Sequence, residues 1–128
     1  MASIVPFAQA MTLCDFHVGY GSGKVDLYGL FNTIRPHAGY PHTHARFCVF
    51  AQLVNGLGIL PFHVDVRCAT RDELVWTSGT NELSFATRNS IVRVAVTVED
   101  LLFAEPGLYL LKLFCDNRWV CDTQLRLR

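Results

Sequence analysis

The sequence predicts an all-β domain, a sandwich or a barrel made of antiparallel strands. Apolar and polar residues alternate most clearly in LPFHVDVRC, residues 60–68, where every second side chain from Phe62 is apolar. Segments rich in β-branched and aromatic residues recur at 46–53 and 90–98, and turn-forming residues separate them. Because no long segment shows a convincing helical period, this pattern is typical of packed sheets.

Length and composition limit the size of the domain and the classes of function. A chain of 128 residues suits one core, so residues 1–128 are expected to form a single β-sandwich domain. Basic and acidic residues balance at 11 each, which disfavours nucleic-acid binding and removes the self-repulsion that keeps domains apart. Hydrophobic residues make up 51% of the chain, so we expect either a permanent protein neighbour or a large core.

The lack of a recognisable targeting signal and the pattern of cysteines favour a cytoplasmic protein. No apolar segment is long enough to span a bilayer, so no membrane partner is expected. The first sixteen residues lack a basic region, and Pro6 and Gln9 interrupt their apolar stretch, which argues against a secretory signal. The cysteines form no CxxC motif, which fits buried thiols in a reducing compartment. They are Cys14, Cys48, Cys68, Cys115 and Cys121.

A glycine-rich turn near the N-terminus predicts a hairpin. KVDLYGLFNTI, residues 24–34, follows GYGSG and is expected to pair with AMTLCDFHV, residues 10–18. Gly29 within the second strand indicates a bulge or a close approach of two backbone segments. GYGSGK, residues 19–24, superficially resembles a nucleotide-binding loop. It lacks the GxxxxGK[ST] spacing and leads into a strand, so we reject that interpretation.

The C-terminal segment GLYLLKLFCDNRWVCDTQLRLR predicts a second hairpin, for which two registers are open. A two-residue loop mixes polar and apolar side chains on each face. A three-residue loop at 117–119 keeps one face apolar by pairing Cys115 with Cys121 and Leu113 with Thr123, so we choose it. A disulfide between these two cysteines is the alternative to two packed thiols, and a cytosolic chain favours the thiols.

The segment before this hairpin contains a turn followed by a tyrosine. Pro106 and Gly107 make the turn, and Tyr109 follows two residues after the glycine. This spacing resembles the tyrosine corner of immunoglobulin-like sandwiches, in which the phenol bonds to an upstream backbone group. We therefore expect an immunoglobulin-like, Greek-key β-sandwich in which these three residues are structural. EDLLFAE, residues 99–105, is expected to form one helical turn that places Leu101 and Phe103 in the core.

The hairpin and the corner together resemble a family of uncharacterised bacterial proteins of similar length, grouped as a domain of unknown function. The matching segments are CDF (14–16), GSGKVDLYGLFNTI (21–34) and LFAEPGLYLLKLFCDNRWV (102–120), and the similarity covers nearly the whole chain. The resemblance implies an immunoglobulin-like β-sandwich in a bacterial cytoplasm. It supplies no activity and no catalytic residues, and His42 and His44 lie outside the shared pattern.

The segment IRPHAGYPHTHARFCVF raises the question of a metal site at His37, His42 and His44. Three histidines suffice for a catalytic zinc or a non-haem metal, and in a strand the last two would share a face. Two prolines and a glycine mark the stretch as a loop instead, and a cupin-like site would need a glutamate that is absent. No acidic residue lies between Asp26 and Asp65 to orient the imidazoles. A solvent-exposed loop, or a rim where the imidazoles bond locally, is therefore preferred.

The remaining signals favour a non-catalytic binding or assembly module that self-associates or docks onto a protein partner. We expect no catalytic residue and no cofactor, because every cysteine falls in a predicted strand and no GxSxG motif is present. Tyr40 and Trp119 are the interface candidates, since exposed aromatic residues anchor interfaces, although both are equally suited to covering the core. The alternative is a metal-dependent enzyme or metal-binding protein that uses the three histidines. Carbohydrate or peptide recognition by end loops is not separable from the first hypothesis.

Overall fold

The computed structural model describes residues 2–128, and every regular element in that range is a β-strand. This confirms the all-β prediction. The strands are β1 (Phe7–Cys14), β2 (Phe16–Gly19), β3 (Val25–Tyr28), β4 (Thr33–Ile34), β5 (His42–Val54), β6 (Gly58–Cys68), β7 (Glu73–Thr77), β8 (Asn81–Phe85), β9 (Ile91–Phe103), β10 (Gly107–Cys115) and β11 (Arg118–Leu127). No helix within residues 2–128 has the length and apolar character needed to cross a bilayer.

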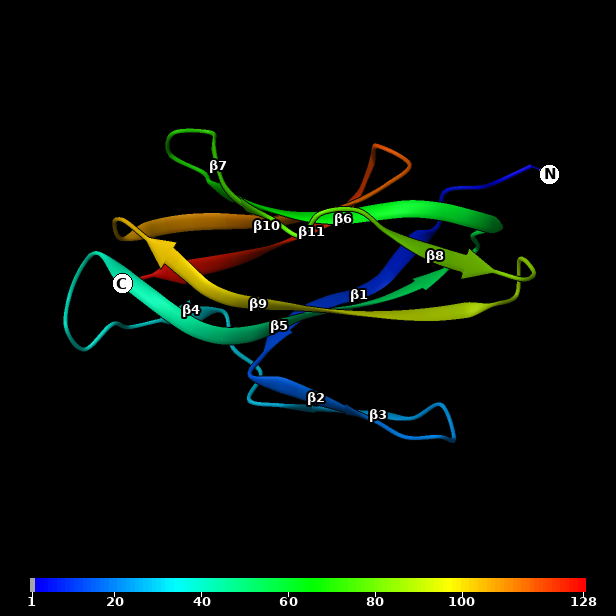
Figure 1. Ribbon diagram of the computed structural model, residues 1–128, viewed down its shortest axis with the longest axis horizontal. Helices are drawn as coiled ribbons and strands as arrows, with labels where there is room; N and C mark the ends of the chain where they lie inside the picture. The colour runs from blue at the N-terminus through cyan, green and yellow to red at the C-terminus, as the bar shows by residue number, and fades with distance from the viewer. Residues whose placement is uncertain (1) are drawn as a thin grey trace.

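Two sheets packed face to face form the body of the molecule (Figure 1). The first has the strand order β1-β5-β9, and the second has the order β4-β11-β10-β6, with β7 and β8 both paired to β6. The pairings in these two sheets are antiparallel except that of β4 with β11, which is parallel. β2 and β3 form a separate hairpin that projects on the far side of the first sheet (Figure 1).

The core lies between the two sheets and has two adjoining parts. Phe47 and Leu111 belong to one part, and Leu53 and Leu113 belong to the other. Met11 packs against both, so the two parts are continuous. Each fully buried Leu or Phe contributes roughly 1.5–3 kcal/mol of hydrophobic stabilisation, which explains how this chain uses its high apolar content.

The end of β9 departs from simple alternation. Val98 is buried, but the next buried residues are Leu101 and Phe103, so the inward-facing phase moves by one residue. Asp100 between them has φ 52°, a left-handed conformation that accommodates this irregularity. The predicted helical turn over 99–105 is therefore wrong, because the strand continues to Phe103. Its two apolar side chains nevertheless enter the core as expected.

The N-terminal hairpin is shorter than predicted, because β1 pairs with β5 and the regular pairing is that of β2 with β3; a bridge between Leu13 and Phe31 continues it. The predicted need for glycine at position 29 has a different cause from the expected bulge or backbone approach, because Gly29 follows β3 and a side chain crowds it. Gly29 has φ 69°, and a Cβ atom there would collide with the carboxylate of Asp15. The amide N–H of Asp15 donates to the carbonyl oxygen of Tyr28 at 2.8 Å, which holds the base of the hairpin together.

The predicted three-residue loop of the C-terminal hairpin is wrong. Asp116 and Asn117 both have positive φ, 51° and 60°, and form a two-residue turn that pairs Cys115 with Arg118. Asp and Asn tolerate this conformation better than most side chains, and the turn suits the twist of a hairpin.

A β-bulge then corrects the register of the same hairpin. The register shifts after Leu113, which pairs with Cys121, and Val120 is the extra residue on β11. Cys115 is therefore not the cross-strand partner of Cys121, and both are free thiols. The bulge places the apolar side chains of the two strands on the same face, which is the arrangement for which the three-residue loop was chosen.

The turn before β10 holds Tyr109 in the core. Its side chain is 2% exposed, and its hydroxyl donates to the carbonyl oxygen of Glu105 at 2.8 Å. The ring also meets Phe103 edge-on, with ring centroids 4.9 Å apart. Gly107 has φ 135°, a conformation that L side chains rarely adopt, so glycine is required where the chain turns after Pro106.

Candidate functional site

His42 and His44 lie in β5 and not in a loop, which corrects the sequence-based interpretation. His42 Nε2 is 3.2 Å from His44 Nδ1. His42 stacks on Phe103 with an interplanar angle of 11°, and His44 lies against Phe47 with centroids 5.8 Å apart. Both rings therefore cover one end of the aromatic core.

This packing disfavours the protonated, positively charged form of His44. Burial lowers the pKa of His44, and the neighbouring His42 lowers it further. Residues 2–128 contain no group of three or more His, Cys, Asp or Glu side chains that could hold a metal ion. His37 is thus not brought into a three-ligand group with the other two histidines.

The two aromatic interface candidates occupy different environments. Tyr40 is half-buried against the core, and its hydroxyl donates to the carbonyl oxygen of Arg128 at 3.1 Å. Trp119 is 58% exposed, and its Nε1 donates to Asp122 Oδ2 at 3.3 Å. Tyr40 therefore closes one end of the core, whereas Trp119 presents its ring to solvent.

A pair of thiols lies between the first sheet and the projecting hairpin. Cys14 and Cys48 are direct cross-strand partners on β1 and β5, and Cys48 Sγ is 3.6 Å from His17 Nδ1 on β2. Burial, reinforced by Cys14, raises the pKa of Cys48 to about 12. Because the nucleophile is the thiolate, this environment favours packing over reactivity. Nothing in the local sequence indicates the contact between His17 and Cys48.

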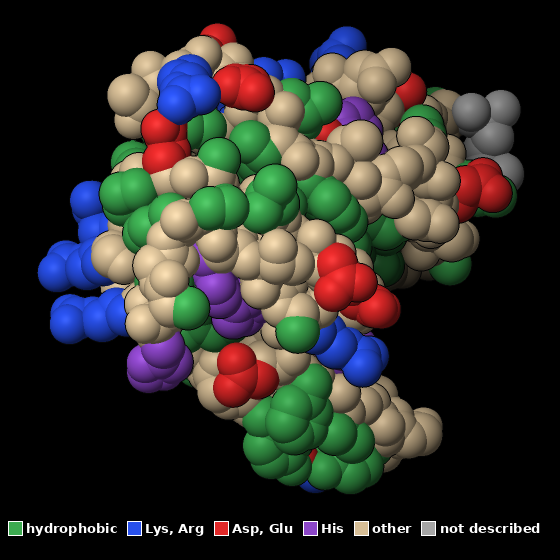
Figure 2. Space-filling model, turned by 60° about the vertical axis from the view of Figure 1, so that its left-hand side comes forward, with side chains coloured by type: hydrophobic (Ala, Val, Ile, Leu, Met, Phe, Trp, Pro, Cys, Tyr) green, Lys and Arg blue, Asp and Glu red, His purple; other side chains and the backbone are tan. Residues whose placement is uncertain are grey.

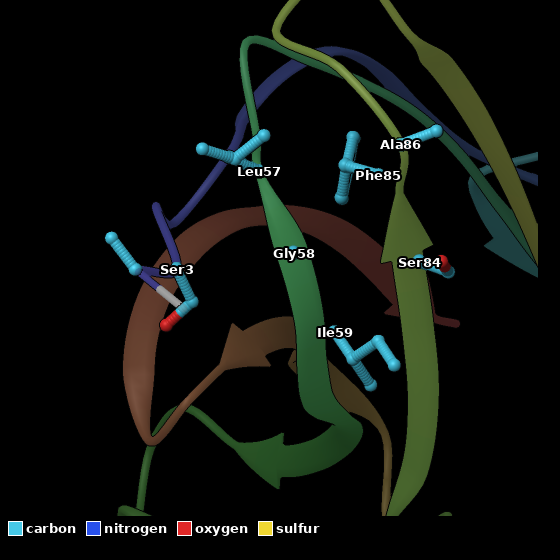
Figure 3. A pocket seen from close by; sticks show the side chains of 8 residues that line it. Ser3, Leu57, Gly58, Ile59, Ser84, Phe85 and Ala86 are labelled. Carbon is cyan, nitrogen blue, oxygen red and sulfur yellow. The ribbon is translucent and has the colours of Figure 1, made fainter.

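A shallow hollow of about 400 Å³ lies where β6 and β8 meet the N-terminal segment (Figure 3). Leu57, just before β6, and Ile59 of β6 lie in the middle of the hollow, with Ser3 of the N-terminal segment on one side of this strand and Ser84 and Phe85 of β8 on the other (Figure 3). Its walls carry no titratable side chain, so the hollow offers apolar contact and two hydroxyl groups but no acid–base chemistry.

The hairpin of β2 and β3, together with the adjoining Tyr20, carries the most distinctive exposed group of side chains; we call it the aromatic arm. Its outer face presents Phe16, Val18, Tyr20 and Tyr28, each between 36% and 51% exposed. Phe16 and Tyr28 are cross-strand partners that stack with ring centroids 4.7 Å apart. Figure 2 shows hydrophobic side chains gathered on the lobe that projects below the body.

One carboxylate organises the rings of the aromatic arm. Asp26 accepts hydrogen bonds from the Tyr20 hydroxyl and, at 3.5 Å, from the Tyr28 hydroxyl. The bond to Asp26 raises the pKa of Tyr20, because it favours the protonated phenol that donates this bond. At the far end of the arm, Arg93 Nη1 on β9 donates to the carbonyl oxygen of Gly23 at 3.0 Å. The arm is therefore fixed to the body at its tip as well as at its base.

Sequence reasoning does not single out Phe16, Tyr20 or Tyr28 as candidates. The available signal is the alternation in the two strands, which places these aromatic residues on one face and Leu27 on the other. Alternation alone does not reveal which face meets the body. The structure turns the aromatic face outward.

The fold and these surfaces define an all-β domain of two packed sheets with an appended aromatic hairpin. A family model matches residues 9–128, and the chain belongs to that family, the family of unknown function DUF6941. This agrees with the resemblance to an uncharacterised family seen in the sequence. No curated protein matches the chain.

Among solved structures, the chain is similar to the crystal structure of a β-glucosidase from Listeria innocua in complex with isofagomine. The TM-score is 0.48 and the sequence identity 10%; the match covers 94% of this chain and 16% of that chain. The chain thus spans a small part of that enzyme, and a similarity at this level carries no argument about function.

Proposed function

We propose that this protein is a non-catalytic binding or assembly module that docks through its aromatic arm onto a protein surface, either a partner's or that of a second copy. The observation that carries the proposal is the set of apolar side chains that the fold leaves in solvent on a projecting hairpin. Aromatic residues are the type that most often anchors protein interfaces. Completing the burial of each half-exposed ring would contribute about 1 kcal/mol.

The aromatic arm is also suited to binding because its side chains are already ordered. The Phe16–Tyr28 stack and the hydrogen bonds to Asp26 fix three rings relative to one another. The Arg93 contact fixes the arm relative to the sheet. A preorganised surface loses less conformational entropy on association than a mobile one.

We further propose an immunoglobulin-like arrangement and a bacterial cytoplasmic setting. The strand orders β1-β5-β9 and β4-β11-β10-β6 and the bond from Tyr109 to Glu105 support the first. Five free cysteines support the cytoplasmic setting, because thiols persist in reducing compartments, and the resemblance to bacterial proteins supports the bacterial one.

The test compares the wild-type protein with Phe16→Ser/Tyr28→Ser. Phe7→Ser is the matched control, since Phe7 is 67% exposed on β1 and lies outside the aromatic arm. Light scattering measures self-association, and capture from the native host measures partner binding. We expect the arm variant to lose assembly at least about tenfold while the control keeps it. A protein that is monomeric and free of partners at high concentration, or an arm variant that assembles normally, would overturn the proposal.

A further inference from the structure

The first sheet leaves one edge open. β9 is 13 residues long and pairs on one side with β5. No other strand within residues 2–128 pairs with it. An unpaired edge presents a row of backbone donors and acceptors that another strand can use, and most proteins shorten or cover such edges. Here the edge is long and carries only three charged side chains, Arg93, Glu99 and Asp100.

A groove of about 460 Å³ runs beside this edge. Ala95, Val96 and Thr97 form its β9 side. Trp76 and Phe62 contribute apolar surface from the second sheet, and Glu82 is among the polar side chains there. The groove therefore combines a free backbone edge, an apolar wall and a polar rim.

From these observations we propose that the open edge of β9 binds an extended peptide segment of another protein, which adds a fourth strand to the β1-β5-β9 sheet. This inference deepens the binding role proposed above and uses a different surface, which meets the aromatic arm at Arg93, the donor to the Gly23 carbonyl oxygen. Strand addition derives affinity from backbone hydrogen bonds and specificity from pockets for alternate side chains.

The groove also indicates the chemistry of the peptide. Alternate side chains of an added strand would face the apolar wall at Trp76, so they should be apolar. On the exposed outer face, Arg93 lies near the start of β9 and Glu99 lies six residues further along the strand. A peptide with an acidic residue beside Arg93 and a basic residue beside Glu99 is complementary in one orientation only.

A second copy fits this edge less well than a single strand. Residues of β7 and β8 line the groove, so these strands stand beside β9. If β9 paired with β9 of a second copy, β7 and β8 of both copies would lie on the same face of the joined sheet. A lone strand needs only the width of the groove.

The experiment uses two nine-residue peptides in which Val alternates with Thr. One carries Lys and Asp in place of its first and last Thr, and the other carries the same two residues exchanged. Titration is followed by Trp fluorescence in a Trp119→Phe background, so that the signal reports on Trp76, and by hydrogen exchange of the amides of residues 94–98. We expect one peptide to bind about tenfold more tightly than the other and to slow that exchange. A version of it with alternate amides N-methylated should lose binding, because it cannot form the ladder.

Two variants make the result specific. Glu99→Arg, confirmed to be folded by its unfolding transition, should abolish the peptide preference, because both charged positions of the edge then attract an acidic residue; it leaves intact the Arg93 bond that holds the tip of the aromatic arm. Phe16→Ser/Tyr28→Ser should bind the peptide as the wild type does. Strand addition at β9 is therefore tested independently of docking through the aromatic arm. Three results would each overturn the inference: no protection of β9 amides by either peptide, equal binding of the N-methylated peptide, or a dimer that protects β9 without peptide.

Discussion

Substitution of Tyr109 by Phe tests the role of the turn that joins β9 to β10. The change keeps the buried ring and its edge-on contact with Phe103 but removes the hydroxyl that donates to the Glu105 carbonyl oxygen at 2.8 Å. A neutral hydrogen bond contributes about 1 kcal/mol net, and a buried acceptor left unpaired costs about 1–3 kcal/mol. Because Glu105 is half-exposed, water reaches part of its surroundings and favours the lower end of that range.

We therefore expect Tyr109→Phe to lower the free energy of unfolding by about 1–2 kcal/mol, which corresponds to a fall in Tm of about 4–8 °C at this size. The assay is urea unfolding at 25 °C followed by Trp fluorescence. Tyr40→Phe is the matched control, because its hydroxyl bonds the Arg128 carbonyl oxygen at an exposed position. The control should cost less than about 0.5 kcal/mol. Equal losses in the two variants, or no loss in Tyr109→Phe, would refute the reasoning.

Two further predictions concern a buried thiol and a strained glycine. The pKa of Cys48 is raised from 9.0 to about 12 by burial, so the unfolded chain loses this proton first as pH rises. Stability should therefore fall above pH 9 by roughly 1 kcal/mol per pH unit from this group, and Cys48→Ala should show a shallower fall in unfolding measurements at pH 8 and pH 10.5. An equal slope in both proteins would contradict this. Gly29→Ala should lower the free energy of unfolding by about 1–2 kcal/mol, because it adds a Cβ in the left-handed region against the Asp15 carboxylate. Urea unfolding is again the measurement, and Gly21→Ala, where the added Cβ meets nothing, should be neutral in it; equal effects would contradict the prediction.

Alternation is the most reliable guide to the fold. It locates the strand at residues 60–68, which forms most of β6, and the segments within β5 and β9. These strands are buried on one face or both, so the apolar spacing is imposed by the core itself. The sequence also indicates the need for glycine at position 29, because a glycine inside a predicted strand weakens it unless a bulge or a nearby group requires the missing side chain.

The errors in the predicted strands arise where a backbone irregularity shifts the alternation of inward-facing and outward-facing side chains by one residue. The bulge at Val120 and the left-handed Asp100 shift the alternation, and no single residue type announces either. Prolines and a glycine just before His42 and His44 favour a loop there. Pairing of these two histidines with β9 instead extends β5 to that point, a tertiary effect that overrides local propensity.

The candidate surfaces are harder to predict than the fold. Trp119 is an interface candidate because of its residue type, and its side chain is exposed. The aromatic arm and the open edge of β9 both depend on the order of strands in the sheets, which the sequence does not specify. A strand at an edge and a strand in the middle of a sheet can have the same alternation.

The central claim is that the outer face of the aromatic arm is covered in the functional assembly. Hydroxyl-radical footprinting of the protein, taken from its native host without dissociation and compared with the isolated chain, tests it most directly. The account predicts slower modification of Tyr20 and Tyr28 in the native preparation, with Phe7 modified equally in both. Equal modification of the two tyrosines in both preparations would contradict it.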